Sequence, residues 1–250
     1  MLAFLTDTTL DLRSSSARFG EGLFETIRIQ DGVPQWLDLH HERLTAGCAA
    51  LGLEVPPPLE ALQTLVAPLC EGLELGILRL LAVDTHLRAW TEPRPVETDS
   101  PQTLGLARTV RRLAGSFGTR FKTLSYLDNR LLHQEARARG LGAVVALNTE
   151  GRLTDTAHAT LVIVRDDRLL TPPEAEGALP GIGRRILREA GLLEEASLTW
   201  DDVERAEGAA LLSALRGLRP LIALDTGPSL NPNHPYLLRA KKLLDARLKS

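Results

Sequence analysis

The 250-residue chain has few residues of the kinds that form disulfides or bind metal ions. Its only two cysteines, Cys48 and Cys70, are too few and too isolated to indicate a disulfide framework or a cysteine metal site. The six histidines show neither an H-x-x-x-H nor an H-E-x-x-H spacing, and the adjacent His40 and His41 point to different faces of any helix. We therefore expect no bound metal ion.

Long hydrophobic runs and an excess of positive charge are also absent. No apolar run approaches the length of a membrane span, and the first 16 residues lack the basic and apolar segments of a signal peptide. The net charge is −3, and the arginines are scattered among nearly equal numbers of acids, so no nucleic-acid-binding face is indicated. With 44% hydrophobic residues, we expect a soluble, cytoplasmic protein that acts on a small molecule.

Lysine is scarce as well. Four of the 29 basic residues are lysine and the other 25 are arginine, and Lys122, in RFKTLSYLDN, is the only lysine before residue 241. Arginine stays protonated and offers no nucleophilic amine, whereas a desolvated lysine can lose its proton and form a Schiff base with a carbonyl compound. Lys122 is either such a lysine or an ordinary surface lysine, and composition alone leaves both interpretations open.

The order of the predicted elements indicates an α+β fold. Alternating residues around Asp31-Gly32 predict a β-hairpin at residues 23–39. The elements follow no regular βαβ rhythm, which argues against a doubly wound sheet. Two further hairpins are expected at 142–155 and 159–173, helices at 40–53, 59–73, 126–140, 182–190 and 235–248, and single strands at 74–83, 103–110, 209–214 and 219–225.

A proline-rich, polar stretch without periodicity, residues 91–102, is the best candidate for a linker. We place the linker itself at residues 96–102. It would join a smaller α/β domain, residues 1–95, to a larger domain, residues 103–250.

Three features could serve a phosphorylated cofactor. The turn Gly181-Ile182-Gly183 leads into a helix, whose N-terminal N–H groups suit a phosphate, although such turns are common. Arg43 could pair with the phosphate through two hydrogen bonds, or it could be a solvated helix arginine. Asp155 ends a predicted strand and could keep a ring nitrogen protonated, or it could be a turn residue.

Together these segments resemble the class IV pyridoxal-phosphate enzymes. That family includes branched-chain aminotransferases, D-amino acid aminotransferases and 4-amino-4-deoxychorismate lyases. The resemblance implies a fold of two α/β domains with pyridoxal 5′-phosphate in the cleft between them, and a homodimer in which each chain completes the other's pocket. It rests on six ordered motifs: FGEGLFETIRI, HHERL, KTLSYLDNRLLHQEARARG, TDTAHATLVIVRDDRLLTP, LPGIGRRIL and SALRGLRPL.

The resemblance assigns most of the cofactor-binding roles. Lys122 resembles the lysine that forms the Schiff base, and Arg43 resembles the phosphate-binding arginine of the H-x-x-R-L motif. Asp155 falls where the family has a glutamate facing the pyridine nitrogen. Four further positions match places where the family holds the phosphate, the first two through backbone N–H groups and the last two in a second turn: Ile182, Gly183, Ser213 and Ala214.

The resemblance also indicates a substrate pocket. Phe24 and Thr26 lie where this pocket begins in the family, and we count Thr26 with Lys122 among the catalytic residues. Arg88 matches a loop arginine near the substrate carboxylate. Three positions depart from the family pattern and bear on transamination more than on cofactor binding: Asp155 is one methylene shorter than glutamate, Thr160 replaces an asparagine, and His158 replaces a small polar residue.

The stretch SALRGLRPL discriminates between members of the family. Its Ser213-Ala214-Leu215-Arg216-Gly217 resembles the form seen in aminodeoxychorismate lyases, whereas aminotransferases typically have a Ser/Thr-rich turn with an acidic residue. We therefore expect a lyase of folate biosynthesis that forms 4-aminobenzoate and pyruvate. The alternatives are a D-amino acid or branched-chain aminotransferase and a pyridoxal-phosphate-binding protein without activity.

Overall fold

The computed structural model describes residues 1–94 and 102–248 of the chain, which form two compact units. The described residues of the first unit are 1–94 and 121–126, and those of the second are 102–120 and 127–248. The linker predicted at 96–102 lies outside the described residues except for Gln102, which begins a strand. The α+β class expected from the sequence is confirmed.

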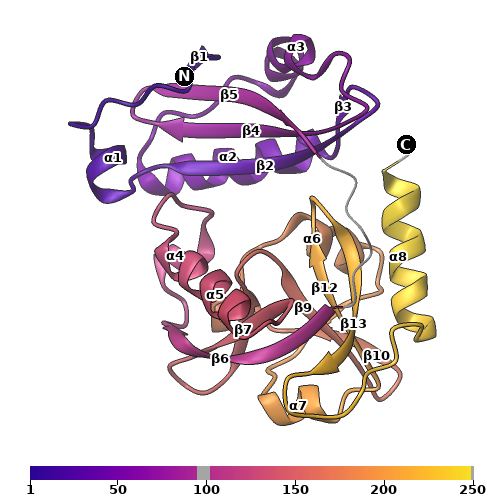
Figure 1. Ribbon diagram of the computed structural model, residues 1–250. Helices are drawn as coiled ribbons and strands as arrows, with labels where there is room; N and C mark the ends of the chain where they lie inside the picture. The colour runs from indigo at the N-terminus through magenta and orange to yellow at the C-terminus, as the bar shows by residue number, and fades with distance from the viewer. Residues whose placement is uncertain (95–101, 249–250) are drawn as a thin grey trace. The chain divides into compact units, whose positions relative to one another are not determined.

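The first unit is a five-stranded sheet with its two longer helices packed against one face (Figure 1). The inward positions of the strands alternate with half-buried outward ones, and they form a single core with the apolar sides of the two longer helices. Both cysteines are free and buried in this unit. The sheet order is β1-β5-β4-β2-β3, and the bounds are β1 (Ala3–Leu5), α1 (Ser15–Phe19), β2 (Leu23–Gln30), β3 (Val33–Pro34), α2 (Leu37–Leu51), α3 (Leu59–Cys70), β4 (Leu75–Val83) and β5 (His86–Pro93).

The segment Phe121–Tyr126, which contains Lys122, belongs to the first unit although it follows strand β6 of the second. It lies along the start of β2: the Phe24 N–H donates to the Lys122 carbonyl at 3.0 Å, and the Leu124 N–H donates to the Gly22 carbonyl at 2.9 Å. Gly22 permits this approach, because a Cβ there would lie 2.9 Å from a Leu124 methyl carbon. The division of the chain therefore involves more than the single linker considered from the sequence.

The second unit is an eight-stranded mixed sheet. Parallel pairs join β6 to β7 and to β13, while β9, β10, β12 and β13 form antiparallel pairs. Helix α5 packs on β6 and β7, and α8 lies beside α6 and β13 (Figure 1). The sheet order is β11-β10-β9-β12-β13-β6-β7-β8, and the bounds are β6 (Gln102–Arg112), α4 (Phe117–Arg120), α5 (Leu127–Ala138), β7 (Ala143–Asn148), β8 (Leu153–Thr156), β9 (Thr160–Arg165), β10 (Arg168–Thr171), η1 (Glu174–Glu176), α6 (Ile182–Glu189), β11 (Glu194–Glu195), α7 (Trp200–Glu204), β12 (Gly208–Ser213), β13 (Gly217–Leu224) and α8 (Pro235–Arg247).

Two absences concern the part of the chain that the structure describes. Within residues 1–94 and 102–248, no helix is long and apolar enough to cross a membrane. The same residues contain no group of three or more His, Cys, Asp or Glu side chains that could hold a metal ion.

Candidate active site

Lys122 is held over two aromatic rings of the first unit. Its Nζ lies 4.1 Å from the centre of the Phe24 ring and 5.1 Å from that of Tyr126. The two rings meet edge to face, with their centres 5.1 Å apart and their planes at 88°. Since the Lys122 backbone also bonds to Phe24, the amine has a fixed place beside the outward face of β2. Sequence reasoning found Lys122 and Phe24 but not Tyr126.

Thr26 lies on the same outward face of β2 as Phe24, two residues along the strand. Its Oγ1 accepts a hydrogen bond of 2.9 Å from Arg79 Nη1, and Arg79 lies directly opposite Thr26 on β4. Arg79 Nη2 also donates to Glu92 at 3.3 Å. Arg79 was missed from the sequence because an arginine in an apolar strand gives no local sign of which residue faces it.

Arg88 was expected to match a loop arginine, but it lies inside strand β5. The strand continues through Arg88 because β5 pairs with β4 from His86 to Pro93. Arg88 is in the same cross-strand row as Phe24, with Leu81 between them. Its guanidinium forms an ion pair with Asp7, and 13% of the Arg88 side chain is exposed. The row places a cation on the same face of the sheet as Phe24 and Thr26.

Arg43 is on α2, where its guanidinium is bound to a buried carboxylate rather than solvated. Its Nε and Nη2 donate to the two oxygens of Glu25, at 2.8 and 2.5 Å. His40, one turn earlier on α2, shares Glu25 through its Nδ1 at 2.7 Å. Burial alone would raise the pKa of Glu25, but Arg43 and His40 outweigh burial and lower it to about 2. Sequence reasoning missed Glu25 and His40, although Glu25 interrupts the inward apolar positions of LFETIRI.

In the second unit, Asp155 is buried in β8. Its Oδ2 accepts a hydrogen bond of 2.6 Å from the Leu179 N–H, while its buried Oδ1 has no hydrogen-bond partner among the described residues. Burial raises the pKa of Asp155, and Arg112, the Leu179 N–H, Arg184 and the Thr160 hydroxyl oppose this rise. An unsatisfied carboxylate oxygen in a buried place is suited to accept a hydrogen bond from a protonated ring nitrogen.

The other predicted phosphate residues of the second unit meet where α6 begins and β12 ends. Ile182 and Gly183 form the first turn of α6, and Ser213 is the last residue of β12. A Cβ on Gly183 would lie 2.9 Å from a methyl carbon of Leu212, so this glycine allows the helix to pack directly on the strand. Ser213 Oγ accepts a hydrogen bond of 3.2 Å from the Arg216 N–H, which closes the turn that contains Ala214.

Thr160 and His158, which differ from the family pattern and follow Asp155 in sequence, have different neighbours. Thr160 Oγ1 would lie 3.3 Å from a Cβ on Gly181, so Thr160 borders the turn before α6. The His158 ring lies 5.2 Å from that of His133 on α5.

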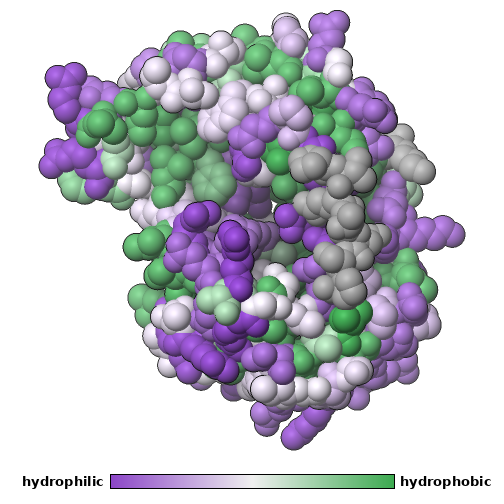
Figure 2. All heavy atoms as spheres, viewed as in Figure 1, coloured by the Kyte–Doolittle hydropathy of each residue, from purple (hydrophilic) through white to green (hydrophobic). Residues whose placement is uncertain are grey.

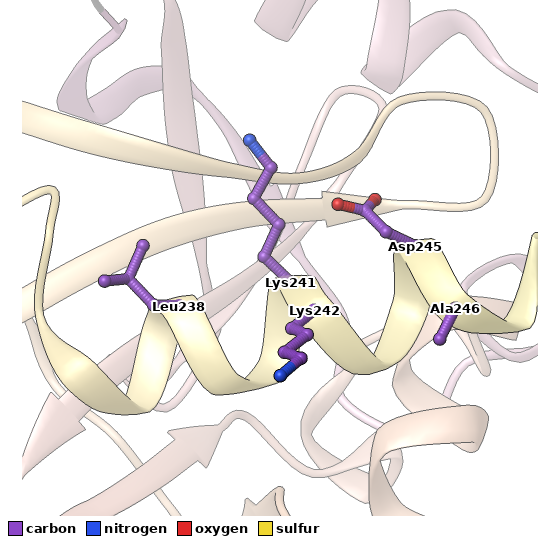
Figure 3. Close-up of a pocket in the computed structure, with 5 residues that line it drawn as sticks. All are labelled: Leu238, Lys241, Lys242, Asp245 and Ala246. Carbon is purple, nitrogen blue, oxygen red and sulfur yellow. The ribbon is translucent and has the colours of Figure 1, made fainter.

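A pocket of about 410 Å³ on α8 is lined only by residues of that helix and contains none of the predicted site residues (Figure 3). We assign no function to this pocket.

Each unit by itself contains groups of the kinds that pyridoxal phosphate requires. The first unit supplies an amine on an aromatic support and an oriented arginine, and the second supplies a buried carboxylate oxygen and a helix N-terminus packed closely on a strand. An amine for the aldehyde, cations and N–H groups for the phosphate, and an acid for the ring nitrogen are the groups that such a cofactor requires.

Comparisons with known proteins show the family. A putative branched-chain-amino-acid aminotransferase of Methanocaldococcus jannaschii is 25% identical over 229 residues, which are 83% of this chain and 80% of the relative. In fold, the chain is similar to a putative 4-amino-4-deoxychorismate lyase of Legionella pneumophila, with a TM-score of 0.90, 24% identity and coverage of 98% and 99% of the two chains. It is also similar to a Brucella abortus aminotransferase bound to pyridoxal phosphate, with a TM-score of 0.85, 21% identity and coverage of 98% and 95%.

The amino-transferase class IV family matches residues 22–224. This range contains five of the six motifs in full and all of FGEGLFETIRI except its first three residues, and the family is dependent on pyridoxal phosphate. The family and cofactor expected from the sequence are therefore confirmed, and the chain belongs to the amino-transferase class IV family.

Proposed function

We propose that this chain is a pyridoxal-phosphate-dependent lyase that converts 4-amino-4-deoxychorismate to 4-aminobenzoate and pyruvate. The observation that supports the lyase most directly is the turn after β12. Gly217 has a φ of 67°, a left-handed conformation that favours glycine, and Ser213 Oγ accepts from the Arg216 N–H inside the same turn. In the Ser-Ala-Leu-Arg-Gly sequence that resembles the lyase form, the turn therefore uses the hydroxyl of the first residue and the left-handed conformation of the last.

Each residue has a proposed role in holding the cofactor. Lys122 would bond to the cofactor aldehyde. Arg43 in the first unit, and the N–H groups of Ile182 and Gly183 in the second, would be the donors to the phosphate. Asp155 would accept a hydrogen bond from the protonated ring nitrogen. Ser213 and Ala214 close the second turn on the phosphate.

The outward face of the first sheet is proposed to receive the substrate. Phe24 and Thr26 border it, and Arg88 offers positive charge to a substrate carboxylate. When bound, pyridoxal phosphate withdraws electrons from the substrate carbon that bears the amine. Once the substrate amine has replaced Lys122 on the cofactor, the freed Lys122 amine would remove the proton from that carbon. The bond between the ring and the enolpyruvyl oxygen would then break, and the ring would become aromatic. The leaving group takes up a proton to become pyruvate, so no oxidant or reductant is needed.

The experiment is a substrate comparison with the purified, cofactor-loaded protein. We expect formation of 4-aminobenzoate from 4-amino-4-deoxychorismate and much slower exchange between amino acids and 2-oxo acids. Exchange without aminobenzoate formation would show an aminotransferase instead. The similarity to the putative branched-chain-amino-acid aminotransferase of M. jannaschii supports that alternative. Cofactor binding without either reaction would show a binding protein.

Substitution of Lys122 tests the cofactor role directly. We expect Lys122→Ala and Lys122→Arg both to abolish activity and the visible absorbance of lysine-bound pyridoxal phosphate, because neither side chain can form the bond. The control is Lys242→Ala, which removes a lysine of helix α8 and should leave the absorbance unchanged. Lys241 and Lys242 both lie on α8 and point to different sides of it (Figure 3). Retained absorbance in Lys122→Arg would contradict the assignment.

A further inference from the structure

The inward face of β2 contains a charged residue where its neighbours are apolar. Leu23, Ile27 and Ile29 are buried in the core of the first unit, and Glu25 lies among them with 1% of its surface exposed. A buried carboxylate is costly unless it is paired and hydrogen-bonded. Glu25 therefore requires partners, and α2 supplies both of them.

Helix α2 presents His40 and Arg43, three residues apart, to the two oxygens of Glu25. Arg43 Nε and Nη2 form a two-point ion pair with Glu25, and this geometry fixes the plane of the guanidinium. The His40 Nδ1 completes the set at 2.7 Å, and His40 is itself only 1% exposed. Three hydrogen bonds thus connect one strand residue to one face of the helix.

We propose that Glu25 is a positioning residue that orients Arg43 for the phosphate of the cofactor. This inference rests on the proposed phosphate role of Arg43. Glu25 receives the Nε and Nη2 hydrogens, and these two bonds fix the direction of the whole guanidinium. Because the charges of Glu25 and Arg43 offset one another, Arg43 contributes to binding through its fixed direction more than through its charge.

His40 supports this arrangement without adding charge. Glu25 accepts hydrogen bonds only, so Nδ1 of His40 bears a proton. Burial lowers the pKa of His40, so the ring is neutral at neutral pH and Nε2 is an acceptor. Nε2 is buried without a hydrogen-bond partner among the described residues. Glu25, Arg43 and a neutral His40 together have no net charge.

The test separates orientation from charge by measuring the dissociation constants of inorganic phosphate and of pyridoxal phosphate. Glu25→Gln keeps the side-chain shape and removes the negative charge near Arg43. If Glu25 positions Arg43, binding of both probes weakens, by about tenfold for the loss of a two-point charged pair. If Glu25 only neutralises Arg43, its removal tightens binding of both anions. Unchanged or tighter binding therefore overturns the proposal.

A double mutant shows whether Glu25 acts through Arg43. We expect Glu25→Gln to have almost no effect on phosphate binding when Arg43→Ala is already present, within about twofold, because the residue being positioned is gone. Independent losses that add would mean that Glu25 acts by another route. Arg43→Lys keeps the charge without the planar two-point pair, so it should weaken binding about as much as Glu25→Gln, and wild-type binding by Arg43→Lys would overturn the proposal.

The control is Glu54→Gln, which removes an acidic side chain of the same unit that pairs with the N-terminal amine at 2.9 Å. We expect it to bind both probes like the wild type. Failure of the wild type to bind pyridoxal phosphate would count against the proposed function. Binding that depends on Arg43 but not on Glu25 would count against this inference alone.

Discussion

Asp155 is suited to bind the ring nitrogen of the cofactor, but its buried carboxylate destabilises the folded protein when no cofactor is bound. Its Oδ2 is bonded to the Leu179 N–H, and its Oδ1 is buried without a partner among the described residues. The raised pKa of Asp155 means that the fold favours the protonated acid relative to the unfolded chain. A protonated ring nitrogen beside Oδ1 would supply the missing hydrogen bond, so the cost applies to the protein without its cofactor.

We predict that Asp155→Asn makes the cofactor-free protein more stable at neutral pH. The raised pKa gives wild-type stability that is present below the usual 3.8 and lost as pH rises through the folded value, whereas asparagine does not ionise. Urea unfolding at pH 3 and pH 7 checks this, since the advantage of the variant should appear only at the higher pH. If Asp155 were a turn residue, the variant would lose up to about 1 kcal/mol at both pH values.

The same variant should affect the two activities unequally. Transamination depends on the protonated ring nitrogen to hold the negative charge, whereas aromatisation of the product supplies much of the driving force for the lyase. We expect Asp155→Asn to lose most of any aminotransferase activity and less of its aminobenzoate formation. Equal activity of variant and wild type in both assays would show that another group serves the ring nitrogen.

For Glu25 we predict the opposite pH dependence of folding stability. Its pKa falls from 4.5 to about 2 on folding, so it contributes stability above pH 4.5 that is lost as pH falls toward 2. The contribution is roughly 3 kcal/mol. The stability difference between wild type and Glu25→Gln, measured by urea unfolding from pH 6 to pH 2.5, should therefore narrow as the pH falls. A difference that does not change with pH would mean that folding leaves the pKa of Glu25 unchanged.

At the scale of elements, turn residues predicted the hairpins well. Asp31-Gly32 joins β2 to β3, and both residues have positive φ, of 52° and 78°, as a tight hairpin requires. Asp166 and Asp167 do the same between β9 and β10, with φ of 51° and 57°. Strand β5 was missed because HLRAWTEP has only two inward apolar residues, and its end at Pro93 lies inside the proline-rich stretch 91–102.

The junction of α6 and β12 depends on a glycine, and this gives a prediction. We expect Gly183→Ala to destabilise the protein by about 1–3 kcal/mol, because the added Cβ would lie 2.9 Å from a carbon of the buried Leu212. The added methyl group should also push the start of α6 away from β12. The N–H groups of α6 would then be displaced, which should weaken binding of pyridoxal phosphate. Thermal unfolding and cofactor titration on one preparation measure both effects.

The control for this substitution is Gly118→Ala in helix α4. A Cβ on Gly118 meets nothing within 4 Å among the described residues, so alanine should leave stability unchanged or raise it by up to about 1 kcal/mol. If both variants behave alike, the close packing of α6 on β12 is not important for stability.

At the scale of the whole molecule, chain order and spatial grouping differ. Lys122 comes after β6 in sequence, yet it is hydrogen-bonded to Phe24 of the first unit. Composition and periodicity report on neighbours in sequence, so they located the linker candidate but not this return of the chain. The contacts of Glu25 with His40 and Arg43 were hidden for the same reason, since they span 15 and 18 residues.

The surface has hydrophobic residues among hydrophilic ones, as Figure 2 shows. In the described part of the second unit, five large hydrophobic side chains are exposed, and four of them lie between residues 113 and 131: Leu113, Phe117, Leu127 and Leu131. Leu127, 69% exposed, and Leu131, 37% exposed, are four residues apart and so lie on one side of α5. Exposed apolar side chains that share one side of a helix indicate a surface that binds another protein.

We predict a homodimer in which this side of α5 is part of the interface. The wild type should sediment with twice the 27.3 kDa mass of the chain, and Leu127→Ser with Leu131→Ser should shift it toward the monomer. Surface substitutions of this kind change folding stability by about 0.5 kcal/mol or less, so a change in mass would report on association. Leu238→Ser, at a leucine that is 48% exposed on α8, is the matched control and should stay dimeric. A monomeric wild type would contradict the dimer, and a dimeric double variant would place the interface elsewhere.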